Sequence, residues 1–139
     1  TADEAAIRAR IGNHFEAMRW SPEEPADWAT FADDFLPGAA LYPAARPVQP
    51  KSVDEFIERM KGVAADVLHT FEEHTRGVEV LFFGNVAVVL AASEMLENGA
   101  DVNRDVSGYL LVKSDGEWRI TAHAWDKATE EFPVPGHLL

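Results

Sequence analysis

The clearest pattern along the chain is a pair of apolar-rich runs between Val106 and Lys127. Two runs rich in β-forming residues flank Ser114–Gly116, and an Asp-Gly pair between such runs is a strong β-hairpin signal. Because strand side chains alternate, the second strand has one face with Trp118, Ile120, Ala122 and Ala124 and another with Arg119, Thr121, His123 and Trp125. Neither face is plainly polar. We therefore expect a sheet covered on both sides, by helices on one and by loops or a partner on the other.

Three segments have apolar residues at helical spacing. The first begins with capping-box spacing at Thr1 and ends near Trp20. The second, shorter helix follows the break at Pro22–Pro25 and ends at Pro37–Gly38, and the third begins with a capping box at Ser52. The predicted inward positions are Ile7, Ile11, Phe15 and Met18 in the first helix, Trp28, Phe31 and Phe35 in the second, and Val53, Phe56, Ile57, Met60 and Val63 in the third.

From His69 onward the pattern becomes that of β-strands. A hairpin turns at Gly84–Asn85, and a polar connection at Glu97–Asp105 leads into the last hairpin. A short strand, Ala39–Tyr42, precedes the third helix, and the tail from Glu131 is expected to lie extended over the body. Helices followed by long antiparallel strands predict one α+β domain over residues 1–139, with a curved antiparallel sheet wrapped on three N-terminal helices.

Composition narrows the classes of partner. The chain has 24 acidic and 12 basic residues and a formal net charge of −12, which repels phosphate backbones and anionic membrane surfaces. No apolar run approaches the ~20 residues that span a bilayer. We therefore expect neither nucleic acid nor a membrane as partner. The absence of cysteine is consistent with a reducing compartment, and we expect a cytoplasmic location.

Several segments resemble the nuclear transport factor 2-like superfamily, and its SnoaL-like branch in particular. The segments are Phe82–Glu94, Arg104–Ile120, Trp125–Asp126 and Phe132–Pro135. The resemblance implies a cone-shaped, cystatin-like α+β fold with a pocket at its open end, and commonly a homodimer packed through the sheets. Members include isomerases, cyclases, dehydratases, epoxide hydrolases and non-catalytic binding domains, so function must be argued from the site.

The sequence predicts no metal and no cofactor. His69 and His74 lie an odd number of residues apart on a predicted strand and therefore point to opposite faces. The chain contains no HExxH zinc motif, no GxGxxG dinucleotide motif and no P-loop. We therefore expect any enzyme chemistry here to be cofactor-free.

Asp126 and His14 are the candidate bases. Asp126 resembles the aspartate that several family enzymes carry on a late strand near the mouth of the cone, and it shares strand parity with Trp118. The alternative is a strand-end carboxylate that faces water. His14 lies on the first helix, where a related isomerase class carries a tyrosine, and imidazole can donate or accept a proton. The alternative for His14 is a half-buried packing residue.

A row of charged groups on the first long strand is a further candidate. Glu72, His74 and Arg76 alternate along one face, and the expected register puts His74 opposite Met95 and Arg76 opposite Ser93. An acid, an imidazole and a guanidinium in one row could move a proton and hold an oxyanion. The alternative is a solvated or dimer-facing ladder of charges.

Aromatic side chains from several elements indicate an apolar pocket for a small hydrophobic ligand. The residues expected to touch the ligand are Trp28, Phe31, Tyr42, Phe56, Tyr109 and Trp125. The leading interpretation is a protein that binds such a molecule. One alternative is a cofactor-free isomerase, polyketide-cyclase-like enzyme or dehydratase with Asp126 or His14 as base. The other is a dimerising interaction module.

Both faces of the first hairpin are apolar. They carry Val78, Val80 and Phe82 on one side, and Leu81, Phe83, Val86, Val88 and Leu90 on the other. Only one face can pack against the helices of the same chain, and an exposed apolar patch usually marks an interface. The sequence therefore predicts a homodimer built on the outer face of the sheet.

Overall fold

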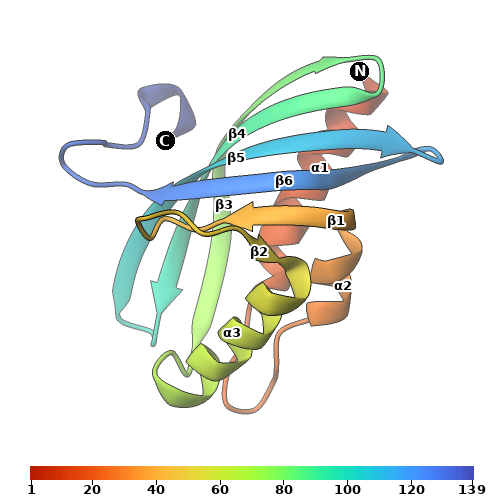
Figure 1. Cartoon of the computed structure of the whole chain (residues 1–139). Helices are drawn as coiled ribbons and strands as arrows, with labels where there is room; N and C mark the ends of the chain where they lie inside the picture. Colours follow the sequence, from red (N-terminus) through yellow and green to blue (C-terminus); the bar gives the residue numbers. More distant parts are fainter.

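The structure is a computed structural model that describes residues 1–139. Its helices lie on the concave side of a curved sheet, and α1 passes behind the strands in the view of Figure 1. The elements in chain order are α1 (Ala2–Ala17), α2 (Trp28–Asp33), β1 (Phe35–Tyr42), β2 (Lys51–Ser52), α3 (Val53–Asp66), β3 (Phe71–Phe83), β4 (Val86–Glu97), β5 (Asp101–Ser114), β6 (Glu117–Lys127) and a terminal 3₁₀ turn, η1 (Gly136–Leu138).

The six strands form one sheet in the order β2-β1-β6-β5-β4-β3. All neighbours are antiparallel except β1 and β6, which run parallel. The long strands β3 to β6 follow one another as a meander, as hairpins with tight turns allow. This arrangement confirms the predicted α+β class and curved sheet.

The helices begin where the capping signals predicted. Thr1 Oγ1 accepts a hydrogen bond from the Glu4 amide at 3.1 Å. The Ser52–Glu55 capping box is complete, with bonds of 2.9 and 3.1 Å, so the first-turn amides of α3 have partners. Ile7 and Ile11 of α1 are fully buried against the sheet, which confirms the predicted inward stripe.

Two predicted boundaries are wrong. The second helix ends at Asp33, and β1 already begins at Phe35. Pro37–Gly38 lies inside β1. The pairing of β1 with β6 shifts register between Phe35 and Ala40, and a proline can lie in a strand where the regular hydrogen-bond ladder is interrupted. The expected polar connection Glu97–Asp105 is also shorter, because β4 and β5 continue to within a turn of each other.

A β-bulge in β3 changes which side chains face the helices. Thr75 pairs with Ser93, whereas Val78 pairs with Ala91, so β3 carries one extra residue between these pairs. As a result Glu73, rather than His74, lies opposite Met95. The predicted pairings of His74 with Met95 and of Arg76 with Ser93 are therefore wrong.

A second irregularity lies in β6. Ile120 pairs with Leu111 and Ala122 pairs with Leu110, which leaves Thr121 as the extra residue. Beyond this point the strand reverses its faces, so His123 is buried while Ala124 is exposed. The prediction that one face of this strand carries Trp118, Ile120, Ala122 and Ala124 is therefore correct only up to Ile120.

The C-terminal tail lies over the body, as expected. Leu138 is 1% exposed, and its backbone passes so close to Gly77 that a Cβ atom there would lie 2.3 Å from Leu138 Cα. His137 Nε2 and Glu79 Oε1 lie 2.7 Å apart and add a polar contact between tail and β3. No helix of the protein combines the length and apolar character needed to cross a membrane.

Candidate functional site

A cavity of about 180 Å³ lies between the helices and the concave face of the sheet. Most of its wall is apolar and comes from Phe15, Met18, Phe31, Leu41, Phe56, Met60, Phe71, Met95 and Trp125. Five polar side chains also reach it, namely His14, Glu73, Asp105, Ser107 and His123. Apolar walls with a few placed polar groups are typical of a site for a small organic molecule.

His14 is the best-positioned polar group of this cavity. It lies on α1 and is 1% exposed, and its Nδ1 lies 2.8 Å from Oδ2 of Asp34. Arg10, one turn earlier on α1, donates from Nη1 to the other Asp34 oxygen at 2.8 Å. Because the Asp34 carboxylate accepts from His14, Nδ1 carries the proton and Nε2 presents a lone pair. No group of the protein bonds this Nε2.

Aromatic rings fix the orientation of the His14 imidazole. It stacks on Phe31 with centroids 4.5 Å apart and an interplanar angle of 20°. The edge of Phe35 meets it at 5.1 Å and 79°. Such packing removes water from the ring and leaves it little rotational freedom, so the Nε2 position is preorganised.

A second histidine, His123, lies near the first. Its ring stacks on Tyr109 with centroids 4.1 Å apart, and its centroid lies 6.4 Å from that of His14. Neither nitrogen of His123 has a partner. Burial, with a smaller contribution from His14, holds the pKa of His123 well below its ordinary value. His123 is therefore neutral and offers one N–H donor and one lone pair.

Glu73 and Asp105 are the acidic groups of the cavity. Burial raises the pKa of Glu73 to about 8, although Ser93 Oγ donates a hydrogen bond of 2.7 Å to its carboxyl group. Burial also raises the pKa of Asp105 to about 6, against the opposing effect of Lys127. At neutral pH Glu73 is mostly a carboxylic acid and can donate a hydrogen bond.

The structure brings four of the sequence-predicted residues to the cavity: His14, Phe31, Phe56 and Trp125. The other aromatic candidates do not line it. Tyr109 lies behind His123, and Trp28 packs against Phe31 with centroids 5.4 Å apart. Tyr42 is 36% exposed and borders a depression on the outer surface.

Asp126 lies outside the cavity. Its side chain is 68% exposed, 3.9 Å from Arg46 Nη2, and its Oδ1 accepts a hydrogen bond from the Lys127 amide. The prediction that its carboxylate points into the pocket with the parity of Trp118 is wrong, because the extra residue at Thr121 reverses the faces of β6.

The row formed by Glu72 and His74 faces solvent. Oε2 of Glu72 lies 3.0 Å from His74 Nε2, and Glu16 Oε1 lies 3.2 Å from the other ring nitrogen. The Glu72 bond, followed by that of Glu16, raises the pKa of His74. Arg76 is exposed at the bulge. This corresponds to the solvated ladder of charges rather than to a catalytic row.

Five polar residues of the site were not predicted: Asp34, Glu73, Asp105, Ser107 and His123. Glu73 and His123 face inward only because of the two bulges. The one sequence signal for either bulge is Gly77 inside an otherwise regular strand pattern, since such a glycine often marks a bulge or a close backbone approach.

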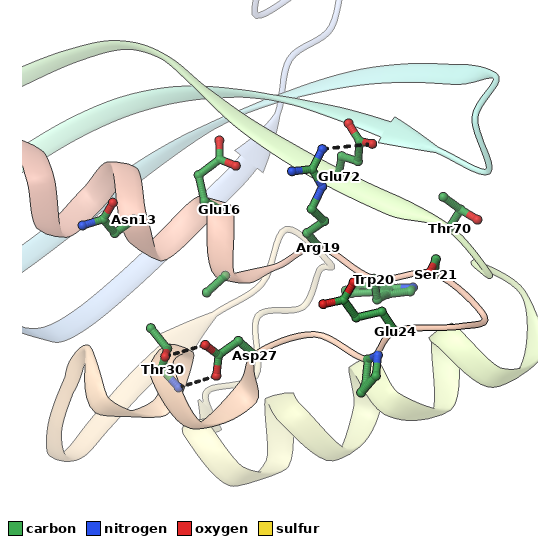
Figure 2. Close-up of a pocket in the computed structure, with 12 residues that line it drawn as sticks. Asn13, Glu16, Arg19, Trp20, Ser21, Glu24, Asp27, Thr30, Thr70 and Glu72 are labelled. Carbon is green, nitrogen blue, oxygen red and sulfur yellow. Dashed lines mark hydrogen bonds and ion pairs between the residues drawn. The ribbon is translucent and has the colours of Figure 1, made fainter.

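A larger depression of about 440 Å³ lies on the surface between the end of α1, the following loop and β3. Figure 2 shows that three of its charged groups are already engaged: Arg19 pairs with Glu72 at 3.3 Å, and Asp27 accepts from Thr30 N and Oγ1 at the start of α2. An apolar ligand would find few partners there, so we place the functional site in the interior cavity.

No family model matches the chain, and no curated protein matches it by sequence. Solved structures do match. An NTF2-like protein of unknown function from Pseudomonas putida has a TM-score of 0.73 and 13% identity over 90% of this chain and 86% of its own. The chain has an NTF2-like fold. The match confirms the resemblance at the level of fold.

Two further structures share this NTF2-like fold. A candidate scytalone dehydratase from Novosphingobium aromaticivorans has a TM-score of 0.72 and 12% identity over 92% of this chain and 85% of its own. A cystatin-like domain of unknown function from Nostoc punctiforme has a TM-score of 0.71 and 21% identity over 94% and 81%. At such identities the likeness shows the fold alone, and activity must be argued from the side chains.

Proposed function

We propose that this NTF2-like chain is a cofactor-free enzyme that binds a small, mostly apolar molecule in its interior cavity and moves a proton on it through His14. The observation that carries the proposal is the free Nε2 of a buried histidine whose other nitrogen is held by Asp34 at 2.8 Å. A buried nitrogen without a partner costs stability, and contact with a substrate would supply that partner.

The geometry supports proton abstraction next to a carbonyl group. Nε2 of His14 takes the proton from carbon, and the Asp34 carboxylate stabilises the imidazolium that forms. The electron pair moves to the carbonyl oxygen, where an N–H of His123 or the acid proton of Glu73 can stabilise the developing charge. If the substrate is a β,γ-unsaturated carbonyl compound, the charge spreads to the γ-carbon, and return of the proton there moves the double bond into conjugation, which is an isomerase reaction.

A dehydratase needs the same groups. If the neighbouring carbon carries a hydroxyl group, the enolate expels it and a carbon–carbon double bond forms. The departing hydroxyl takes the proton from His14 and leaves as water.

The cavity limits the size of the substrate. An apolar cavity of about 150 Å³ is large enough to hold benzene, so about 180 Å³ suits one six-membered ring or a chain of similar volume. The apolar side chains that line the cavity would pack around such a ring.

The test is solvent-hydrogen exchange, because it requires no knowledge of the natural substrate. Cyclohexanone, acetophenone and 3-hydroxycyclohexanone are incubated with protein in D₂O, and NMR follows deuterium entry and loss of water. We expect catalysed exchange or elimination with the parent protein, and a loss of at least about 100-fold in His14→Gln, since general-base contributions are typically 10²–10⁴-fold.

Asp126→Asn is the matched control, because it removes a carboxylate outside the cavity and should leave exchange unchanged. Equal rates in the parent protein and His14→Gln would contradict the proposal. Binding of these ketones without any exchange would instead support a protein that only binds a small hydrophobic molecule.

We also propose that the chain forms a homodimer through the outer face of the sheet. The support is a group of exposed apolar side chains on β3 and β4, including Leu81 at 65%, Phe83 at 86% and Val88 at 56% exposure. Patches of this kind usually mark interfaces. Sedimentation should give a dimer at micromolar concentration. Val88→Lys should shift it toward monomer, and Val67→Lys, at an exposed site just after α3, should not. A monomeric parent protein would contradict the proposal.

A further inference from the structure

A groove of about 230 Å³ adjoins the cavity on its outer side. Phe56, Met60 and Trp125 line both, so the groove and the cavity adjoin at these three side chains. The outer wall of the groove contains Lys51, from β2, and Arg59, from α3. A ligand in the cavity that extends past Trp125 therefore reaches two cationic side chains.

Neither Lys51 nor Arg59 lies within ion-pair distance of a carboxylate, although Lys51 is near enough to help lower the pKa of Glu55 after the larger effect of the Ser52 hydrogen bonds. Eight of the 12 basic side chains lie within 4.0 Å of a carboxylate, as expected in a chain with 24 acidic residues. Two of the remaining four line this groove. Glu55, one turn from Arg59, is bonded to the amide of Ser52 at the start of α3. A strongly acidic protein thus keeps two unpaired cations beside the mouth of its cavity.

The inner wall of the cavity has the opposite character. Glu73 and Asp105 are its carboxyl groups, and Glu73 is 6% exposed. An anionic group placed there would lose its water to the apolar walls, and Asp105, whose pKa of about 6 leaves it mostly ionised at neutral pH, would repel it. A ligand with one anionic end therefore has only one favourable orientation, with that end at Lys51 and Arg59 and its neutral end inside.

We propose that this groove binds the anionic group, a carboxylate or a phosphate ester, of a ligand whose apolar body fills the cavity. The proposal rests on the proposed function in that both place the same molecule in the cavity. It adds the substrate class, a small cyclic compound with one acidic substituent. It also fixes the orientation, since the reacting atoms lie at the end remote from the charge.

The size of the effect follows from the exposure of the two cations. Arg59 is exposed and Lys51 half-buried, and each such ion pair typically contributes a factor of about two to five in affinity. Together they should favour the anionic ligand by about five- to twentyfold. The preference should weaken with added salt, because screening acts strongly on exposed charges.

The test compares three ligands with the same phenylpropyl body: 3-phenylpropionate, 3-phenylpropyl phosphate and the neutral 3-phenylpropanol. Affinities are measured by NMR titration at low and high salt. We expect the propionate or the phosphate to bind at least fivefold more tightly than the alcohol, and the stronger of the two identifies the anion. Arg59→Gln and Lys51→Gln should each reduce this preference.

Lys61→Gln is the matched control, since it removes a positive charge from the same helix at a residue that pairs with Glu58. It should leave the preference intact. Equal binding of acid and alcohol, no binding of any of the three, or an equal effect of Lys61→Gln would overturn the inference. These binding measurements do not depend on catalysis. If His14→Gln exchanged hydrogen as fast as the parent protein, the proposed function would be contradicted, but the preference for the anionic ligand could still be observed.

Discussion

Replacing Glu73 by Gln should change how the stability of the protein depends on pH. The folded state holds the Glu73 proton up to a pKa of about 8, whereas the ordinary value is 4.5. Between these values the unfolded chain releases the proton and the folded chain keeps it, so the free energy of unfolding falls as pH rises. The stability that the folded protein gains by holding this proton is fully present below pH 4.5 and is lost as pH rises through about 8.

The two pKa values differ by about 3.5, and at about 1.4 kcal/mol for each pH unit the greatest loss is roughly 5 kcal/mol. Water that enters the cavity will lower this figure. Glutamine is uncharged at every pH and can keep the bond from Ser93 Oγ. We therefore expect Glu73→Gln to resemble the parent protein near pH 4.5 and to be about 2–5 kcal/mol more stable at pH 9.

The assay is urea unfolding followed by tryptophan fluorescence at intervals from pH 4.5 to pH 9. Glu72→Gln is the control, because Glu72 is adjacent but exposed, and its hydrogen bonds to His74 and Arg19 lower its pKa. It should not stabilise the protein at high pH. If the free energy of unfolding changed with pH in the same way in Glu73→Gln and the parent protein, the reasoning that Glu73 is buried in its protonated form would be refuted.

Two packing predictions follow from the fold. Trp118 is 3% exposed and its Nε1 donates to Asp3 at 3.0 Å, so Trp118→Ala should cost about 3–5 kcal/mol; a change of only a degree or two in Tm would show that the ring is not in the core. Gly77→Ala should lower the free energy of unfolding by about 1–3 kcal/mol, because the added methyl group would overpack against Leu138. Gly62→Ala, in open space on α3, should instead raise it by roughly 0.5–1 kcal/mol. Equal Tm changes in the two variants would contradict this account.

The sequence was sufficient to predict the three helices and the two long hairpins. The N-cap at Thr1, the capping box at Ser52 and the turns at Gly84–Asn85 and Asp115–Gly116 are local signals, and the structure confirms them. The predicted apolar cavity walls at Phe31 and Phe56 also follow from helical periodicity, which depends on each helix alone.

The polar half of the site could not be predicted in the same way. A strict two-residue period assigns His74 and Asp126 inward, but one extra residue in β3 and one in β6 place Glu73 and His123 there instead. Whether a strand takes up a bulge depends on its partners and on the curvature of the whole sheet. The pairing of His14 on α1 with Asp34, which follows the end of α2, joins residues 20 positions apart, so it requires the tertiary fold.

The most direct test of the central claim is ¹⁵N NMR of the histidine side chains at pH 8, above the ordinary imidazole pKa of about 6.5. The account predicts that His14, assigned by the signal missing in His14→Gln, has a protonated Nδ1 and a non-protonated Nε2. It further predicts that the Nε2 signal shifts when acetophenone is added. A protonated Nε2, or a signal that no small ketone perturbs, would contradict the account.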